Sequence, residues 1–252
     1  MIDSTFSQSM HKAVMEGYLT SINAQTENPF VLKGGTALYL CYGLDRFSVD
    51  IDLDAVDDIR GKTRNLFVSS ITEFCEANDY EFHLGKSGEA GQKMYLHYDE
   101  GKSNPLKIEV SYRRAAIPSE EITVVSGIQV YKVDYLAEQK VSAFANRDRI
   151  RDLYDITYVV DKYHELLKPE TLRQVQHALE YKGFEYFDYI ASTQPDSFID
   201  TSVLEMRFLE TFEKVGLLTP KKLIKKRIAA AKEKSAEKSN TKATTGAKEC
   251  QR

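Results

Sequence analysis

The chain has 252 residues, 42% of them hydrophobic, which is enough to bury the core of one large domain or of two small ones. Its formal net charge is -4, but residues 221–252 hold 11 Lys and Arg against 3 Glu, so the rest of the chain carries 23 basic and 35 acidic side chains. The three cysteines show no CxxC spacing, so we expect neither a disulfide framework nor a zinc site. The first residues show no signal-peptide pattern and no run of eighteen apolar residues occurs, so we expect no export signal and no membrane span. We therefore expect a cytoplasmic protein.

The first half of the chain predicts a mixture of helices and strands. We expect a helix over residues 6–21, a short strand over "PFVLKGG", a short helix that starts at Thr36 and stops near Gly43, and a strand over "RFSVDIDLDAV". Residues 57–78 follow a helical period. Four alternating stretches then predict strands that are antiparallel in part: "YEFHLG", "KMYLHYD", "LKIEVSY" and "GIQVYKV".

The second half of the chain is helical in pattern. Helices are expected over residues 134–147, 151–167, 169–182 and 196–216, and disorder beyond about Ala231, where Lys, Ala, Ser and Thr dominate. The predicted fold class is therefore α+β. It comprises a mixed-sheet domain (1–132), a helical domain (133–220) and a basic tail (221–252) that is either solvated or in contact with nucleic acid. A ligand cleft is expected between the two domains.

The stretch "RFSVDIDLD" concentrates acidic residues on one face of a strand. Alternation places Asp50, Asp52 and Asp54 on that face, about 7 Å apart, where like charges repel unless water or a cation intervenes. A calcium loop of the EF-hand type is excluded, because its sixth and twelfth positions would be Ala55 and Gly61. Two interpretations remain, namely a plain exposed strand face and a site for Mg²⁺.

The preceding segment "KGGTAL" favours the second interpretation. It places Gly34 and Gly35 between a strand and a helix N-terminus, where backbone N–H groups and the helix dipole favour phosphate. The segment is not a Walker A loop, since Lys33 precedes the glycines. A Gly-Gly turn alone is often no more than a turn. Together with the acidic strand it predicts a nucleotide site.

The segment "FVLKGGTALYLCYGLDRFSVDIDL" resembles the opening signature of the AbiEii/AbiGii toxin proteins, in the DNA polymerase β type nucleotidyltransferase superfamily. Their pattern is a Gly-Gly or Gly-Ser turn followed by S-x-D-x-D. The resemblance implies a nucleotidyltransferase fold in which Asp50 and Asp52 bind Mg²⁺ (or Mn²⁺) together with the nucleoside triphosphate substrate. The nucleotide-binding residues that it implies are Lys33, Gly34, Gly35, Thr36, Ser48 and Lys140.

A third acid from a neighbouring strand often completes the metal site in this superfamily. The resemblance implies Glu109 in "LKIEVSY", which faces away from Ile108 and Val110. The alternative is that Glu109 faces solvent and pairs with Lys107 or Arg113. Asp54 is a secondary candidate, because the superfamily pattern does not require it.

The helical half contains a second candidate group. Lys140 occupies a position that the apolar stripe of its helix would give to an apolar residue, so its ammonium either reaches a phosphate in the cleft or extends to solvent. Asp152 and Asp155 lie one turn apart on the next helix, where pairing with Arg149, Arg151 or Lys140 would also explain them as surface ion pairs. The pattern K-x(2)-A-x(3)-R followed by "RDLYD" resembles the downstream motif of the same toxins, which implies that Lys140 and Asp155, with Asp152 behind, support activity.

The resemblance implies a toxin of a type IV toxin-antitoxin or phage-defence system, encoded beside an antitoxin with a winged-helix domain. The activity implied is transfer of a nucleoside monophosphate to an acceptor hydroxyl, which for some relatives is the 3′ end of tRNA. Because the body of the chain is acidic, an RNA acceptor would need basic groups such as Arg113, Arg114, Arg147 and the tail. Two other functions stay open: a nucleotidyltransferase that acts on an antibiotic or another small molecule, and a non-catalytic nucleotide-binding or interaction protein.

Overall fold

The computed structural model describes residues 6–25, 28–56, 61–99 and 104–218, so the predicted disorder of the tail lies outside the described residues. The described chain has the predicted α+β class. The strands are β1 (Val31–Lys33), β2 (Asp50–Asp54), β3 (Glu81–Gly88), β4 (Gly91–His97), β5 (Leu106–Ser111), β6 (Ile122–Val125) and β7 (Ile128–Tyr131). The helices are α1 (Gln8–Asn23), α2 (Gly34–Cys41), α3 (Lys62–Asn78), α4 (Val133–Asn146), α5 (Ile150–Tyr163), α6 (Pro169–Lys182), α7 (Tyr186–Thr193) and α8 (Thr201–Lys214). Two short 3-10 helices, η1 (Ser119–Glu121) and η2 (His164–Leu166), complete the elements.

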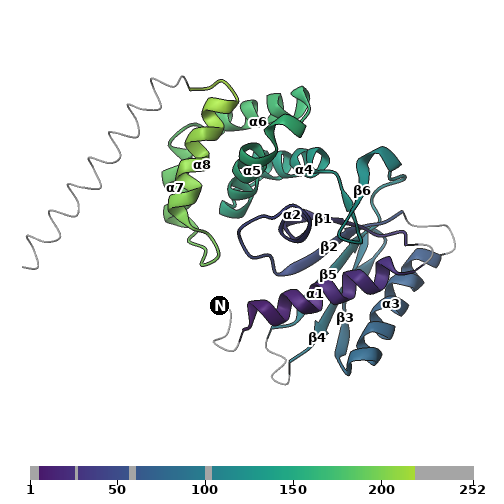
Figure 1. Ribbon diagram of the computed structural model, residues 1–252. Coiled ribbons are helices and arrows are strands. Elements are labelled where there is room, and N and C mark those ends of the chain that lie inside the picture. Colours follow the sequence, from purple (N-terminus) through teal and green to yellow (C-terminus); the bar gives the residue numbers. More distant parts are fainter. Residues whose placement is uncertain (1–5, 26–27, 57–60, 100–103, 219–252) are drawn as a thin grey trace, which may run out of the picture.

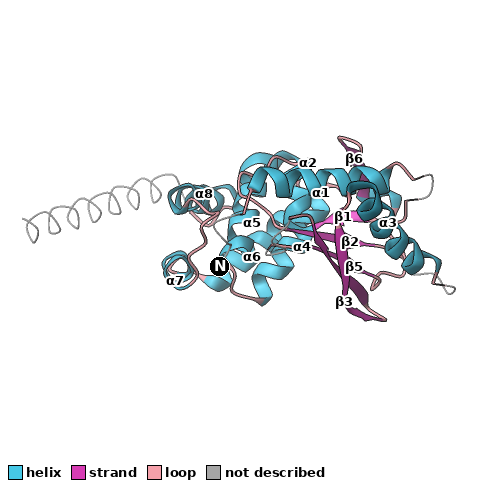
Figure 2. Ribbon diagram, turned by 90° about the horizontal axis from the view of Figure 1, so that it is seen from below, coloured by secondary structure: helices cyan, strands magenta, loops and turns pink. Residues whose placement is uncertain are grey.

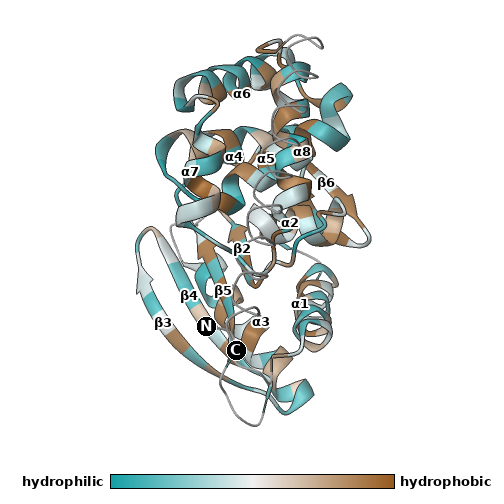
Figure 3. Cartoon of the chain, turned by 90° about the vertical axis from the view of Figure 1, so that its left-hand side faces the viewer, coloured by the Kyte–Doolittle hydropathy of each residue, from teal (hydrophilic) through white to brown (hydrophobic). Residues whose placement is uncertain are grey.

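The seven strands form one mixed sheet in the order β3-β4-β5-β2-β1-β7-β6. Strand β2 runs parallel to β5 and antiparallel to β1, and β1 runs parallel to β7. Along β4 and β5 every second residue is buried, as their alternating sequences predict, and Figure 3 shows the change between hydrophilic and hydrophobic residues along these strands.

Helices α1 and α3 pack together beside the sheet, and α4 to α8 form a separate group of helices (Figures 1 and 2). The buried Tyr18 of α1 shares a hydrogen bond with Ser70 of α3, and Ile51 and Leu53 of β2 are also buried. Since Asp50 and Asp52 alternate with these apolar residues, the carboxylates lie on the opposite face of the sheet, toward α4. None of the helices in the described ranges is long and apolar enough to cross a membrane.

Several predicted elements differ from the structure for local reasons. Helix α2 begins at Gly34 rather than at Thr36, with Lys33 as its N-cap residue, and Gly34 adopts a φ of +74°, which favours glycine. Strand β2 begins only at Asp50, and Val49 before it is half-buried. Strand β6 and helix α7 were not predicted, since four consecutive β-branched residues show no alternation and eight residues are too few to reveal a helical period.

Candidate active site

Four charged side chains form one row across the face of the sheet that is turned toward α4. Lys33 of β1 is paired with Asp52 of β2, Asp52 with Glu109 of β5, and Glu109 with Lys93 of β4. Side chains that are paired in this way point to the same face, and their strands are about 4.8 Å apart. The row therefore places two carboxylates side by side, with a lysine at each end.

Asp52 is the carboxylate of this row without a partner. Among the described residues, none donates a hydrogen bond to its side chain or forms an ion pair with it. Burial raises the pKa of Asp52, and the neighbouring charges of Asp50 and Glu109 raise it further, while Lys107 and Lys33 act against them. A cation at this point would stabilise the ionised form of Asp52.

Asp50 and Glu109 are held by lysines. The Asp50 carboxylate lies 2.6 Å from Lys107 Nζ, and the Glu109 carboxylate lies 3.1 Å from Lys93 Nζ. Lys107 and Arg113 were the predicted alternative partners of Glu109. Both of these predictions are wrong, because the partner of Glu109 is Lys93.

The residues present fit a magnesium site only in part. In the described ranges, no three His, Cys, Asp or Glu side chains are grouped so that they could hold one metal ion, so the predicted set of Asp50, Asp52 and Glu109 is not assembled. Mg²⁺ is usually bound by one or two carboxylates together with substrate phosphates and water. Asp50 and Asp52 fit that smaller donor set, and phosphate oxygens would complete it.

The Gly34-Gly35 turn approaches the acidic strand closely. A Cβ added at Gly34 would lie 3.0 Å from Asp52 Oδ2, and one added at Gly35 would lie 2.9 Å from Arg46 Nη2 and 3.1 Å from Ser48 Oγ. Glycine avoids these clashes, and it lets the backbone at the start of α2 approach Asp52 closely.

Thr36 and Ser48 lie behind this turn rather than in front of it. Both are buried, and the Thr36 hydroxyl donates a hydrogen bond to the backbone oxygen of Asp50 and shares a second one of 2.8 Å with the Ser48 hydroxyl. These contacts connect the first turn of α2 to the segment that enters β2. Their placement suits positioning of the turn better than direct contact with a ligand.

A cavity of about 790 Å³ lies over the carboxylate row. Its walls come from the Gly34-Gly35 turn, β2, β5, the β3–β4 hairpin and α4. The predicted site residues that line it are Lys33, Gly34, Gly35, Asp52, Glu109 and Lys140, whereas Thr36, Ser48, Asp50, Asp152 and Asp155 do not. Of the basic groups expected to reach RNA, Arg113 and Arg147 line the cavity, while Arg114 lies elsewhere and pairs with Glu121 at 2.8 Å.

Lys140 enters the cavity from α4 and is held from behind by Asp155. Its Nζ lies 2.6 Å from Asp155 Oδ2, and Arg46 donates two hydrogen bonds of 2.7 Å to the same carboxylate. Asp155 is fully buried. Burial by itself raises the pKa of Asp155, but the charges of Lys140 and Arg46 outweigh it and hold that pKa below its usual value.

Asp152 supports Arg147 in a similar way. Arg147 donates hydrogen bonds of 2.6 and 3.0 Å to the Asp152 carboxylate, and Lys140 Nζ lies 3.9 Å away. The alternative of surface ion pairs is wrong, because Asp152 and Asp155 are 2% and 0% exposed. The expected partners Arg149 and Arg151 are also wrong, since Arg151 pairs with Asp196 and Arg149 forms no ion pair within the described chain.

Arg46 is a site residue that the sequence analysis did not identify. It is 3% exposed, and its guanidinium lies against Gly35 and joins the segment before β2 to Asp155 on α5. The sequence signal that could have revealed Arg46 was its position at the start of "RFSVDIDLD". Its partner Asp155, however, lies 109 residues further along the chain.

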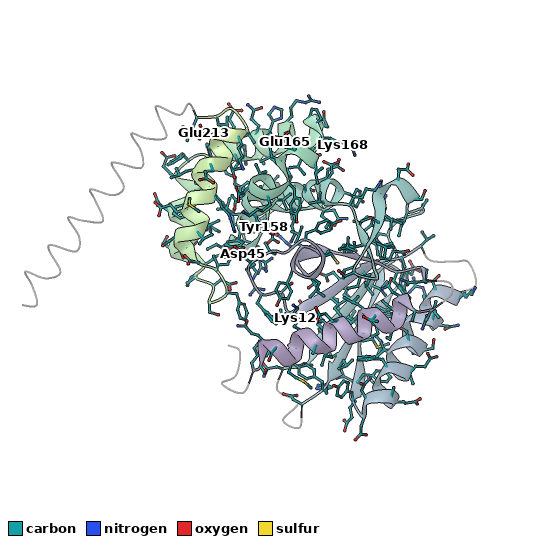
Figure 4. All side chains as sticks on the ribbon, in the orientation of Figure 1. Lys12, Asp45, Tyr158, Glu165, Lys168 and Glu213 are labelled. Carbon is teal, nitrogen blue, oxygen red and sulfur yellow. The ribbon has the colours of Figure 1, made fainter. Side chains whose placement is uncertain are left out.

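Asp45, one residue before Arg46, accepts two hydrogen bonds from Arg207 of α8. The guanidinium of Arg207 lies 5.1 Å from the Tyr158 ring, and Figure 4 labels Asp45 and Tyr158 at this contact.

Asp54 has structural partners instead of a place in the cavity. It is 4% exposed, pairs with Lys33 at 2.5 Å and accepts a hydrogen bond of 3.0 Å from the Tyr131 hydroxyl. These contacts link β2 to its neighbour β1 and, across β1, to β7. They also hold the Lys33 ammonium away from Asp52.

Comparisons with known proteins concern the family and the fold of the chain. A family model described as the nucleotidyl transferase AbiEii toxin of type IV toxin-antitoxin systems matches residues 18–244. The structure of JHP933 from Helicobacter pylori is similar, with 24% identity, a TM-score of 0.65 and coverage of 93% of this chain and 100% of that one. A candidate nucleotidyltransferase from H. pylori shows 25% identity, a TM-score of 0.65 and coverage of 89% and 98%.

The nucleotidyltransferase toxin MenT4 from Mycobacterium tuberculosis is more distant, with 18% identity, a TM-score of 0.54 and coverage of 85% of each chain. A search of curated proteins found no match. The solved structures support the fold, and the family model spans the sheet, the Gly34-Gly35 turn and the helices that carry Lys140 and Asp155. The chain thus belongs to the AbiEii family of nucleotidyl transferase toxins of type IV toxin-antitoxin systems.

Proposed function

We propose that this protein is a Mg²⁺-dependent (or Mn²⁺-dependent) toxin that transfers a nucleoside monophosphate from a nucleoside triphosphate to a hydroxyl of RNA, with the 3′ end of tRNA as the favoured acceptor. The observation that supports the site best is Asp52, a carboxylate with a raised pKa and with no partner among the described residues, which lines one cavity with the glycine turn and Lys140. The toxin MenT4, which has the same fold, supports a transferase of this kind.

The residues of the candidate site have distinct roles in this proposal. The amides of Gly34 and Gly35 would bind the phosphates, and Lys140, held by Asp155, would neutralise the triphosphate as pyrophosphate leaves. Asp50 and Asp52 would hold the metal, with Glu109 as a further ligand once Lys93 releases it. When bound, a divalent cation supplies positive charge for the phosphates and orients the attacking hydroxyl.

We also propose a division of the chain into domains and a cellular setting for this reaction. Residues 1–132 would form the catalytic domain and residues 133–220 the helical domain, with the tail from 221 to 252 as a basic extension. The family supports an antitoxin partner, and we propose one with a winged-helix domain in a cytoplasmic phage-defence system.

A labelling experiment tests the function. The protein is incubated with Mg²⁺, each labelled nucleoside triphosphate and total RNA, alongside Asp50→Ala, Lys140→Ala and a control, Lys132→Ala, at an exposed lysine outside the cavity. We expect the parent and Lys132→Ala to label RNA, and the two site variants to lose at least about 100-fold in rate, the size of a lost charge-stabilising group. Equal labelling by all four proteins would refute the site assignment.

Two alternative functions give different results in the same experiment. Labelling of an added small hydroxyl acceptor in place of RNA would favour a small-molecule transferase. Binding of a nucleoside triphosphate without any transfer, with every acceptor and metal supplied, would favour a non-catalytic nucleotide-binding protein.

A further inference from the structure

Six cationic side chains of the described residues line the cavity, and four of them pair with carboxylates. Lys33 and Lys93 pair with Asp54 and Glu109. Lys140 of α4 and Arg147, just after α4, are each held by a buried carboxylate of α5. Lys86 of β3 and Arg113, just after β5, line the opposite side, which we call the hairpin wall. Both are exposed, and within the described part of the chain neither forms an ion pair or a hydrogen bond. The hairpin wall therefore holds two cations that pair with no carboxylate among the described residues, although Glu89 and Glu109 line the same cavity.

The hairpin wall lies on the far side of Asp52 from the Gly34-Gly35 turn. From the turn on β1 and α2, the strands follow in the order β2, β5, β4 and β3. Lys86 thus stands on a strand three spacings, or about 14 Å, from β2. Arg113 extends the alternating series of Glu109 and Ser111, which lines the same cavity.

The geometry of phosphoryl transfer indicates from which side of the cavity the acceptor enters. The attacking hydroxyl and the leaving pyrophosphate lie roughly in line, on opposite sides of the phosphorus. If the triphosphate binds at the glycine turn and Lys140, the acceptor must enter from the side of β5, β4 and β3. This step rests on the function proposed above.

We propose that Lys86 and Arg113 form the acceptor subsite and bind phosphates of an RNA strand that precede its reacting 3′ terminal nucleotide. Free cations attract a polyanion by releasing its counterions, and an arginine and a lysine bind phosphate oxygens well. The same two charges repel polycationic acceptors such as amino sugars. The two charges of the hairpin wall thus favour a phosphate strand as the acceptor.

The closeness of the hairpin to β5 supports a rigid subsite. A Cβ at Gly91 would lie 2.5 Å from the backbone oxygen of Val110, so the end of the β3–β4 hairpin is packed against β5. Arg64 of α3 also donates hydrogen bonds of 2.8 and 2.5 Å to the backbone oxygens of Gly88 and Glu89. The loop between β3 and β4 is therefore held in place, and with it the strand that carries Lys86.

The test measures RNA and nucleotide binding separately in the full chain. The double variant Lys86→Glu/Arg113→Glu is compared with a charge-matched control, Lys132→Glu/Arg173→Glu, at exposed residues outside the cavity. The probe is a fluorescein-labelled single-stranded RNA of about 12 nucleotides, comparable with the longer site sizes of single-strand binders, and binding is followed by anisotropy over a range of salt concentrations. A fluorescent nucleoside triphosphate reports the nucleotide site.

We expect the Lys86→Glu/Arg113→Glu variant to bind RNA about tenfold or more weakly than the control, with a salt slope smaller by about 1.4, or 0.7 for each lost phosphate. Its nucleotide affinity should equal that of the control, and the variant Lys86→Arg/Arg113→Lys should bind RNA like the parent. Equal RNA binding by the two Glu variants would overturn the subsite, as would a loss of nucleotide binding in place of RNA binding. Failure of the parent to bind any nucleotide would instead refute the proposed function.

Discussion

At the scale of single residues, Asp52 is a carboxylate whose ionisation costs stability. Its pKa is raised by burial and by the nearby carboxylates, so the folded chain binds a proton more readily than the unfolded chain does. The stability that this proton adds is present below the unfolded pKa and is lost as the pH rises through the folded pKa. At neutral pH the parent therefore carries an unfavourable charge unless a cation binds.

We predict that Asp52→Asn abolishes transfer yet raises the melting temperature at pH 7 by a few degrees, about what 1 kcal/mol produces in a chain of this size. Millimolar Mg²⁺ should stabilise the parent and not the variant. Differential scanning calorimetry with and without Mg²⁺ measures both effects, and Asp188→Asn, at an exposed acid, is the control. A lower melting temperature for Asp52→Asn would show that the carboxylate is structural.

At the scale of elements, Arg46 joins the segment between α2 and β2 to helix α5. Its ion pair with Asp155 is buried, so removal of the guanidinium leaves the carboxylate with Lys140 alone. Asp155 would then draw Lys140 more strongly away from the cavity. Both the fold and the phosphate site depend on this one contact.

We predict that Arg46→Met lowers the free energy of unfolding by about 3–5 kcal/mol, the usual cost of breaking a buried ion pair. The matched control is Arg151→Met, whose pair with Asp196 is 37% exposed on the arginine side, and which should cost less than about 1 kcal/mol. Urea denaturation measures both values. Equal costs for the two variants would contradict the proposed role of Arg46.

At the scale of the whole molecule, paired carboxylates join the group of helices to the rest of the chain. Asp45 and Asp155 make these connections, whereas Asp196 pairs with Arg151 within the group of helices. Burial by itself raises the pKa of all three, but their Arg and Lys partners lower each of these pKa values below 3.8. A carboxylate whose pKa is lowered on folding adds stability that is complete above its unfolded pKa. That stability is lost as the pH falls through the folded pKa.

We predict that the melting temperature falls only slightly from pH 7 to about pH 5, because burial lowers the pKa of His11, and falls steeply below about pH 4, near the unfolded pKa of Asp. Circular dichroism and tyrosine fluorescence should give coincident transitions, because Asp45–Arg207 and Arg46–Asp155 connect the two halves. The fall should be shallower in Asp155→Asn. A steep loss already between pH 7 and pH 5 would contradict this account.

The local pattern of the sequence determined the features that depend on neighbours along the chain. Alternation alone placed Asp50 and Asp52 on one face of a strand, and the glycine pair placed an open turn before them. The gap in an apolar stripe marked Lys140, which does line the cavity. These features follow from periods of two and 3.6 residues, which are visible in a short window.

Only the tertiary structure decided which charges meet. The register of β2 and β5 set Asp52 beside Glu109, and that of β4 and β5 gave Glu109 to Lys93 rather than to Lys107. Arg46 reached Asp155 across 109 residues. No local period encodes such contacts, since they depend on strand order and on how the helices pack. The same packing left Lys86 without a carboxylate partner among the described residues, and that lysine carries the proposed acceptor subsite.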